Sequence, residues 1–336
     1  MPIRPVTPTT IGQDRLAELR DQGADSELLE MRLALIEREG LRKDIAKMRG
    51  KHRVYPEVLP TQASGRWSTK HPNIPGFARE FWVKHSGIIH PDTGEWWLEW
   101  DFKGIEARMF TAYSGDEEDV ELFRLGTPDI HDFTCVKYLM AWQPDLQIGD
   151  VIQYPADWIG SKDERRTRAK NFRYGVLQYG QNEKAILGMP GIEKLGLHRN
   201  TLLQRARQFL DARPKGVAFK RRTFEECERD KVARTFMGRR RLLFGPPEQR
   251  AKEGLNHKIQ GAVADLMDWC LIQITQTWPQ SSVILNKHDG ALVAFPNTLA
   301  ENLVVPQVKA LVEKSWEVGQ GVTMVFPASW HVIHGV

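Results

Sequence analysis

The sequence predicts an α+β fold in which early and late strands form a sheet and the residues between them form a helical insertion. Three observations lead to this prediction. A Trp-rich apolar run at residues 95–100 is typical of a buried strand, and it ends at the acid Asp101. Two further apolar runs surround Asp289 and Gly290 near the other end of the chain. Between these regions the spacing of apolar residues is mainly helical.

The composition is that of an ordinary folded protein, with 336 residues of which 41% are hydrophobic and 27% are charged. No run approaches the ~20 apolar residues of a membrane span. The N-terminus also lacks the apolar core of a signal peptide. We therefore expect a cytoplasmic protein without a membrane partner. Cys135, Cys227 and Cys270 lie far apart without CxxC spacing, which argues against both disulfides and a zinc site.

The N-terminal part of the chain divides into a helical and an irregular segment. Residues 11–50 are charged and show a broken helical pattern, which predicts two short helices. Residues 51–92 are rich in Pro, Gly, Ser and His, but the Trp and Phe residues among them favour a packed irregular segment over a flexible linker. After the strand at 95–100, residues 104–114 are predicted to form a helix.

The rest of the chain is predicted to be mostly helical before the last strands. Residues 161 to about 179 have a strong helical pattern, and a long polar helix, broken by the sequence ARPKG, is predicted over 199–236. The turn-rich sequence FMGRRRLLFGPP at 236–247 predicts a hairpin. A further helix is predicted over 256–277, because its apolar residues fall on one side.

Basic residues gather in three runs, although the formal net charge is only +4. These runs lie at 165–173, 220–222 and 238–241. A single run of this kind is typical of a solvated helix face. Three of them favour a polyanionic partner, because local positive charge attracts a phosphate backbone.

Asp101 and Asp289 are candidate metal ligands, because each lies at the end of an apolar strand. Two carboxylates on neighbouring strand ends can hold two divalent cations ~4 Å apart, which stabilises the attacking and leaving oxygens in phosphoryl transfer. The alternative is that Asp289 and Gly290 only form a hairpin turn, since Asp-Gly is a common turn sequence. Taken alone, this pair favours the turn.

Arg166, Lys170, Tyr174 and Gln178 recur every four residues and therefore form one stripe on a helix. A guanidinium and an ammonium one turn apart can bind adjacent phosphates of a triphosphate, and an aromatic ring one turn further on can cover a base or sugar. A solvated basic helix would explain the two cations. It would leave the tyrosine unexplained.

Seven segments resemble, in order, those of family A DNA polymerases, the family of bacterial polymerase I and related phage enzymes. DFKGIEAR, RTRAKNFRYG and NKHDG resemble its motifs A, B and C. ASGRWSTKHPNIPG, PDIHDFT, TFMGRRR and NHKIQGAVADLM resemble its TGRxSS, DIHxxTA, TxxGRRR and QGxAAD segments. The resemblance covers the chain from about residue 50 to the end. It implies a right-hand polymerase core with an antiparallel-sheet palm, helical fingers and a truncated helical thumb.

The resemblance also implies where these parts lie. Residues 1–60 would form the partial thumb, because ELLEMR is similar to a thumb sequence of the family. The palm would consist of residues 61–108 and 245–336, with the fingers at 109–244 inserted between its two parts.

Individual roles follow from the same resemblance. Asp101 and Asp289 would bind two Mg²⁺ ions, which Mn²⁺ could replace. Glu106 would lie where a ribose 2′-hydroxyl would go, so that deoxynucleotides are selected. The other nucleotide contacts would come from Phe102, His131, Arg166, Lys170, Tyr174, Gln178 and Tyr179. Primer or template contacts would come from Arg66, Arg239, Arg240, Lys252, Asn256, Gln260 and His288.

Three positions depart from the family's pattern. Gly290 follows the motif C aspartate, where the family usually has Glu, so an altered metal affinity is expected. Gln178 stands where a second aromatic residue is usual, and Tyr179 is displaced by one position. Either a distortion of the helix restores Tyr179 to the pocket, or Gln178 replaces it. Lys252 stands where an Arg is expected.

The expected function is therefore template-directed DNA synthesis from a primer 3′-hydroxyl and dNTPs, with primer-template DNA as partner. No DxE-type exonuclease signature fits the N-terminal residues, so we expect the polypeptide not to proofread, and a separate exonuclease or N-terminal polymerase chain is a candidate partner. A phage origin, and hence the host cytoplasm, is expected. The alternatives are an enzyme similar to single-subunit RNA polymerases, which Glu106 argues against, and a catalytically inactive DNA-binding subunit, which Gly290 favours.

Overall fold

The computed structural model describes residues 57–59, 62, 64–70, 90–155, 162–178, 186–188, 196–319 and 321–334. They belong to two units. The first unit consists of residues 1–59 and 68–89, and its described part is one antiparallel pair, β1 (Glu57–Leu59) and β2 (Ser68–Lys70). The helices predicted within 11–50 lie outside the described residues, as does most of 51–92. The second unit consists of residues 60–67 and 90–336.

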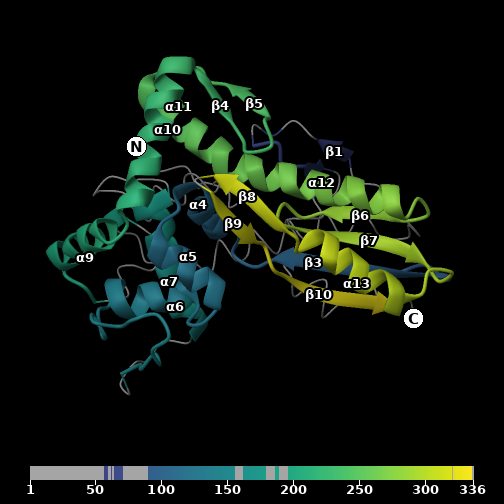
Figure 1. Cartoon of the computed structure of the whole chain (residues 1–336), viewed down its shortest axis with the longest axis horizontal. Coiled ribbons are helices and arrows are strands. Elements are labelled where there is room, and N and C mark those ends of the chain that lie inside the picture. Colours follow the sequence, from purple (N-terminus) through teal and green to yellow (C-terminus); the bar gives the residue numbers. More distant parts are fainter. Residues whose placement is uncertain are drawn as a thin grey trace, which may run out of the picture. The chain divides into compact units, whose positions relative to one another are not determined.

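A four-stranded antiparallel sheet with the strand order β10-β3-β7-β6 is the base of the second unit (Figure 1). Its strands are β3 (Glu95–Phe102), β6 (Ser282–Asn286), β7 (Gly290–Pro296) and β10 (Ala328–His334). Trp96, Leu98 and Trp100, which alternate along one face of β3, are buried, and so is Trp97 on the other face. The strand predicted from the Trp-rich run is therefore present at the centre of the sheet.

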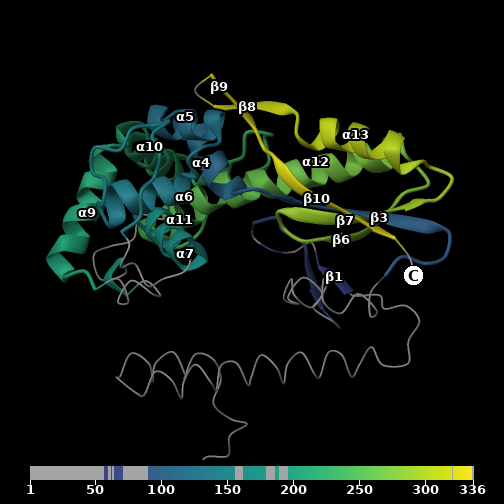
Figure 2. The same cartoon turned by 90° about the horizontal axis from the view of Figure 1, so that it is seen from below.

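Two helices, α12 (Ala262–Thr277) and α13 (Glu301–Val312), lie along one face of this sheet (Figure 2). The buried residues of α12 recur at helical spacing, as the sequence predicted: Val263, Leu266, Met267, Cys270, Leu271 and Ile274. At the end of α12, Trp278 packs edge-on against Phe295 of β7, with ring centroids 6.0 Å apart. These contacts join the sheet and its helical layer into one hydrophobic core.

The residues between β3 and α12 form a mainly helical insertion (Figure 1). Its described helices are α4 (Ile105–Ser114), α5 (Glu117–Leu125), α6 (Ile130–Phe133), α7 (Lys162–Arg173), α9 (Arg199–Asp211), α10 (Pro214–Asp230) and α11 (Pro247–Asn256). Three π-helices also occur among the described residues, η3 (Thr134–Leu139), η4 (Tyr174–Gln178) and η6 (His257–Gly261). After α13 come β8 (Ser315–Gly319) and β9 (Val322–Val325), which pair with each other.

Two predicted helix limits are wrong. The helix predicted to run to residue 236 ends at Asp230, where Lys231 adopts a left-handed conformation with φ 54° and the chain enters β4 (Val232–Arg234). This strand pairs with β5 (Arg240–Leu242), so the predicted hairpin is present but starts earlier. The helical region predicted to begin at residue 256 already begins at Pro247, since proline is well suited to the first turn of a helix.

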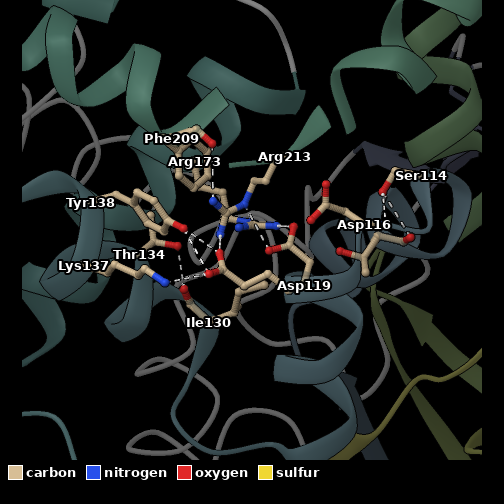
Figure 3. A network of polar contacts seen from close by, with 12 residues as sticks. Ser114, Asp116, Asp119, Ile130, Thr134, Lys137, Tyr138, Arg173, Phe209 and Arg213 are labelled. Atoms are coloured by element: carbon tan, nitrogen blue, oxygen red, sulfur yellow. Dashed lines mark hydrogen bonds and ion pairs between the residues drawn. The ribbon is translucent and has the colours of Figure 1, made fainter. Parts of the chain in front are cut away.

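A buried cluster of charged side chains connects several helices of the insertion (Figure 3). The carboxylate of Asp119 on α5 accepts hydrogen bonds from Arg173 and Arg213, and all three side chains are fully buried. Nη2 of Arg213 also lies 2.8 Å from Oε2 of Glu118, which in turn accepts a 2.8 Å hydrogen bond from the hydroxyl of Tyr138. We call these five residues the Asp119 cluster. Because Arg173 is the last residue of α7, the cluster attaches the end of α7 to α5 and α10.

None of the described helices is long and apolar enough to cross a membrane. The three cysteines are buried and free of disulfide bonds, as their spacing predicted.

Candidate active site

The structure brings the backbones of Asp101 and Asp289 together at one end of the central strand pair. Asp101 lies near the end of β3, directly opposite Gly290 of β7. The backbone N–H of Phe102 donates a 2.7 Å hydrogen bond to the carbonyl oxygen of Asp289. Two acids from distant parts of the sequence therefore lie on neighbouring strand ends, which is the arrangement expected for a shared cation site.

The turn interpretation of the Asp-Gly pair is also correct as a description of the backbone. Residues 287–289 connect β6 to β7, and the backbone N–H of Lys287 donates to the Gly290 carbonyl at 2.7 Å. His288 has a positive φ of 74°, and its N–H donates to Oδ1 of Asn286 at 3.1 Å. The turn thus holds Asp289 directly before β7. Asp289 can therefore belong to a hairpin turn and still be a candidate metal ligand.

The close packing of β3 against β7 explains why residue 290 is a glycine. A Cβ atom at this position would overlap the carbonyl oxygen of Trp100 and would lie 3.1 Å from the Cα of Asp101. Glycine permits this close approach of two backbones, as it often does inside strands. Gly290, which stands where the family usually has Glu, therefore allows an unusually tight contact between β3 and β7.

The surroundings of Asp289 suit a cation. Burial raises the pKa of this carboxyl, and the negative charge of Glu106 raises it further, whereas Arg66 and His288 lower it. A bound cation would relieve the cost of the buried negative charge. The donors are carboxylate oxygens, and Asp101 is exposed, so this donor set fits Mg²⁺. Among the described residues no group of three or more His, Cys, Asp or Glu side chains could hold a metal, so the ligand set of the two aspartates would have to be completed by other oxygens.

Glu106 is held in place from three directions. Its Oε1 accepts a 2.6 Å hydrogen bond from Nη2 of Arg66 and a 3.2 Å hydrogen bond from Nε2 of Gln260. Its backbone carbonyl lies 3.4 Å from Nε2 of Gln178. Glu106 is in the first turn of α4, which starts after Gly104 in the left-handed conformation. The sequence predicted Glu106, Arg66, Gln260 and Gln178 separately, and the structure brings the side chains of the first three together and places that of Gln178 at the Glu106 backbone.

The stripe on α7 and η4 faces the same site. The ring of Tyr174 lies edge-on to His131, with centroids 5.9 Å apart, and Nζ of Lys170 lies 5.5 Å from the Tyr174 ring centroid. Burial raises the pKa of the Tyr174 hydroxyl, and the charges of Glu106 and Asp289 raise it further. The last residue of the stripe reaches the site directly, because Nε2 of Gln178 lies 3.4 Å from the carbonyl oxygen of Glu106.

His131 is fully buried beside the cations of the stripe. Burial lowers its pKa to about 3, and the charges of Arg173, Arg166 and Lys170 lower it as well, while Asp129 acts in the opposite direction. The imidazole is therefore neutral at physiological pH. Its Nδ1 has no hydrogen-bond partner among the described residues. A neutral imidazole can donate one hydrogen bond to a phosphate oxygen without a permanent charge.

Asp129 is a site residue that the sequence analysis missed. Its Oδ1 accepts from the backbone N–H groups of His131 at 2.9 Å and Asp132 at 3.3 Å, which caps α6, and its Oδ2 lies 3.3 Å from Nη2 of Arg166. Asp129 therefore positions both a histidine and an arginine of the candidate triphosphate site. Its place directly before a short helix in the sequence PDIHDFT is the signal that could have revealed it.

The second half of the stripe is a π-helix, η4, rather than a continuation of α7. A π-turn accommodates one extra residue in a helix and is frequent at functional sites. This is the kind of helix distortion that the displaced Tyr179 suggested. Gln178 ends the π-helix and is 1% exposed, with its side chain directed to Glu106. Tyr179 lies outside the described residues.

The predicted DNA contacts are in different environments. Arg240 and Lys252 are exposed, whereas Asn256 and His288 are half-buried. The Arg239 side chain is 34% exposed, but its guanidinium is bonded within the protein, where its Nε donates to Asp265, a residue that the sequence analysis did not single out. Asp265 lies in the QGAVAD segment, which could have drawn attention to it.

Comparisons with known proteins agree with this geometry. The family model described as DNA polymerase family A matches residues 9–332. DNA polymerase I of Aquifex aeolicus (strain VF5) is 28% identical over 272 residues, which are 78% of this chain and 42% of that relative. The thermostable DNA polymerase I of Thermus filiformis is 26% identical over 273 residues, 76% of this chain and 29% of the relative.

Among solved structures, the POL domain of Pol1 from M. smegmatis, in complex with DNA primer-template and dNTP, has a similar fold. The TM-score is 0.72 at 20% sequence identity, and the match covers 96% of this chain and 55% of that chain. The predicted right-hand polymerase core is thereby confirmed as the fold. This chain spans less than half the length of the two relatives, 42% and 29%. The family match extends over nearly the whole sequence, and the chain therefore belongs to DNA polymerase family A.

Proposed function

We propose that this chain carries a template-directed DNA polymerase site that extends a primer 3′-hydroxyl with dNTPs. The observation that carries the proposal is the adjacency of Asp101 and Asp289 at the strand ends, together with the stripe of Arg166, Lys170, Tyr174 and Gln178, whose last residue lies 3.4 Å from the carbonyl oxygen of Glu106. The family match and the relatives named DNA polymerase I support it. So does the solved structure of similar fold, whose protein is bound to primer-template and dNTP.

In this proposal the cations and the neutral histidine bind the incoming triphosphate. The guanidinium of Arg166 and the ammonium of Lys170 neutralise phosphate charge, and His131 donates a hydrogen bond. The ring of Tyr174, which packs edge-on to His131, would cover the sugar and base of the nucleotide. Asp101 and Asp289 would hold two Mg²⁺ ions, which when bound stabilise charge on the attacking and leaving oxygens.

The reaction is the attack of the primer 3′-oxygen on the α-phosphorus of the dNTP. The new bond joins this oxygen to the phosphorus, the bond to the bridging oxygen of the β-phosphate breaks, and pyrophosphate leaves. The residues of the chain contribute mainly by orienting the triphosphate and by fixing positive charge beside it. Glu106 selects deoxynucleotides, because a 2′-hydroxyl would meet a carboxylate held by Arg66 and Gln260.

We further propose that these 336 residues do not proofread. Exonuclease chemistry with divalent metals needs a second acidic cluster, and the segments that resemble the family all belong to the polymerase site. The measurement is the fate of a mismatched primer 3′ end incubated with the purified protein and Mg²⁺ in the absence of dNTPs. Shortening of that primer would contradict the proposal.

The polymerase proposal is tested by extension of a labelled primer-template with Mg²⁺ and dNTPs. Asp101→Asn and Asp289→Asn should each abolish extension while the binding of duplex DNA persists. Asp211→Asn, at the exposed end of α9, is the matched control and should extend the primer at the wild-type rate. Normal extension by either active-site variant would overturn the metal assignment. Primer-independent synthesis from rNTPs would instead favour an enzyme similar to single-subunit RNA polymerases.

A further inference from the structure

Arg239 donates hydrogen bonds from one nitrogen to two segments that each carry a partner of Glu106. Its Nη2 donates to the carbonyl oxygen of Ser64 at 3.0 Å and to the carbonyl oxygen of Gly261 at 2.7 Å. Ser64 is two residues before Arg66, and Gly261 directly follows Gln260. Arg66 and Gln260 are the two side chains that donate to Oε1 of Glu106.

The segment before Arg66 is shaped to fit the guanidinium of Arg239. Gly65 has a φ of 79°, and a Cβ atom there would overlap the guanidinium group. The backbone N–H of Gly65 donates to the Gln62 carbonyl at 2.7 Å, which closes a tight turn. A residue with a side chain could not bring this turn so close to Arg239. The position of Arg66 therefore depends on the contact between Gly65 and Arg239.

The segment of Gln260 is packed just as closely. A Cβ atom at Gly261 would lie 3.1 Å from Nη2 of Arg239 and 2.9 Å from Nδ1 of His257. His257 and Gly261 are the first and last residues of the π-helix η6, which also contains Gln260. Nε2 of His257 lies 3.2 Å from the carbonyl oxygen of Arg239. Both the side chain and the backbone of Arg239 thus contact the π-helix that presents Gln260.

Arg239 is itself fixed by Asp265 and Thr235. Its Nε donates to Oδ1 of Asp265, and the hydroxyl of Thr235 donates to Oδ2 of the same carboxylate at 2.5 Å. The backbone N–H of Arg239 donates to Oγ1 of Thr235 at 3.1 Å. A planar guanidinium with donors in a fixed fork can join three acceptors in this way, which a lysine ammonium on a flexible stem cannot reproduce.

We propose that Arg239 is a positioning residue for sugar selection: it holds the Arg66 and Gln260 segments so that both donate to the Glu106 carboxylate. This inference rests on the proposed role of Glu106 in selecting deoxynucleotides. It gives Arg239 a role inside the protein in place of the DNA contact that the family resemblance implies. Asp265 and Gly65 belong to the same arrangement. Asp265 accepts a hydrogen bond from the guanidinium of Arg239, and Gly65, which has no side chain, leaves room for that group.

The test compares kcat/KM for single dNTP and rNTP incorporation by wild-type protein, Glu106→Ala, Arg239→Lys and the double variant. Arg239→Lys keeps the positive charge, so a contact with DNA would be largely retained. It loses the guanidinium that donates to the carbonyl oxygens of both Ser64 and Gly261. The dNTP/rNTP ratio should fall about tenfold, which corresponds to the loss of hydrogen bonds to a charged group. In the Glu106→Ala background, Arg239→Lys should cause no further fall.

Gly65→Ala is the second variant, because it leaves the side chains of Arg239 and Asp265 unchanged, whereas its Cβ fills the space of the guanidinium and strains the turn at a φ of 79°. It should lower the dNTP/rNTP ratio in the same way. Arg241→Lys is the matched control. Arg241 lies on the same hairpin, 2.7 Å from Glu253, and its replacement should leave the ratio at the wild-type value.

The outcomes separate the inference from the function on which it rests. An unchanged ratio in Glu106→Ala would overturn the sugar-selecting role and this inference together. A lowered ratio in Glu106→Ala with unchanged ratios in Arg239→Lys and Gly65→Ala would overturn the inference alone. An equal loss of dNTP and rNTP incorporation in Arg239→Lys, with weaker DNA binding, would also overturn it, because it would return Arg239 to a DNA contact.

Discussion

Asp101 and Gly290 lie directly opposite each other in the two central strands, and their backbones are too close for any side chain at position 290. The same strand pairing that brings the two candidate metal ligands together thus determines the residue after Asp289. This relationship explains why a glycine can stand at a position where the family usually has an acid.

We expect Gly290→Ala to push β3 and β7 apart and to reduce primer extension strongly. Overpacking of this kind costs roughly 1–3 kcal/mol of unfolding free energy. Urea denaturation and extension assays would measure both effects. Gly319→Ala is the control, since a Cβ there would meet its nearest atom, in Tyr113, at an ordinary 3.5 Å. Full activity of Gly290→Ala would show that the two backbones can separate without harm to the site.

Lys170→Met should weaken nucleotide binding more than DNA binding. Lys170 lies beside the Tyr174 ring and its charge acts on His131, so its loss removes one positive charge from the candidate triphosphate site. KM for dNTP should rise roughly tenfold or more, because a charge-assisted hydrogen bond is lost. Steady-state kinetics and DNA titration measure the two effects. Arg199→Met, at the exposed start of α9, should change neither quantity.

The Asp119 cluster should be essential for stability. Arg173→Met would leave the carboxylate of Asp119 with one partner, Arg213, in a fully buried place. Removal of one member of a buried ion pair typically costs about 3–5 kcal/mol of unfolding free energy. Chemical denaturation would measure this loss. Lys215→Met removes the exposed pair of Lys215 with Glu117 and should leave the unfolding free energy nearly unchanged. Comparable effects of the two substitutions would contradict the structural role of the cluster.

Asp116 should make stability depend on pH. Burial raises the pKa of this carboxyl from its ordinary 3.8 to about 6, and the charge of Asp119 raises it further, whereas Arg213 and Arg173 lower it. The folded protein therefore binds this proton more tightly than the unfolded chain. The resulting stabilisation is complete below pH 3.8, declines as the pH rises and is lost above about pH 6.

Asp116→Asn keeps the side chain neutral at every pH. Its unfolding free energy should equal that of the wild type near pH 4 and exceed it by roughly 3 kcal/mol at pH 7, as a pKa difference of this size implies. Urea denaturation at both values checks the prediction. A constant difference between the two proteins across this range would show that Asp116 titrates normally.

Much of the architecture was predictable because its signals are local. The Trp-rich run gave β3, the Asp-Gly turn gave β6 and β7, and the one-sided apolar pattern gave α12. The end of α10 was misjudged, because the left-handed turn at Lys231 has no Gly or Pro to mark it. The π-helices also escaped prediction, since their spacing differs from that of an α-helix by a single residue.

The residues of the candidate site could be named from the sequence, but their contacts could not. The family resemblance implied roles for Glu106, Arg66 and Gln260, whereas their meeting at one carboxylate oxygen depends on packing between distant segments. The sequence also did not reveal that Arg239 donates hydrogen bonds within the protein, because a basic run is typical of a charged surface. Buried ion pairs such as Arg173 with Asp119 have no periodic signal at all.

The position of β3 between β10 and β7 has a consequence for biosynthesis. Both neighbours of this strand come from the last part of the sequence, Gly290–Pro296 and Ala328–His334. On the ribosome, β3 and its tryptophans therefore lack strand partners until residues 290–296 and 328–334 have been translated. Such late, non-local pairing folds slowly and exposes apolar surface to aggregation. We therefore expect nascent chains of this protein to need chaperone protection until their last strands emerge.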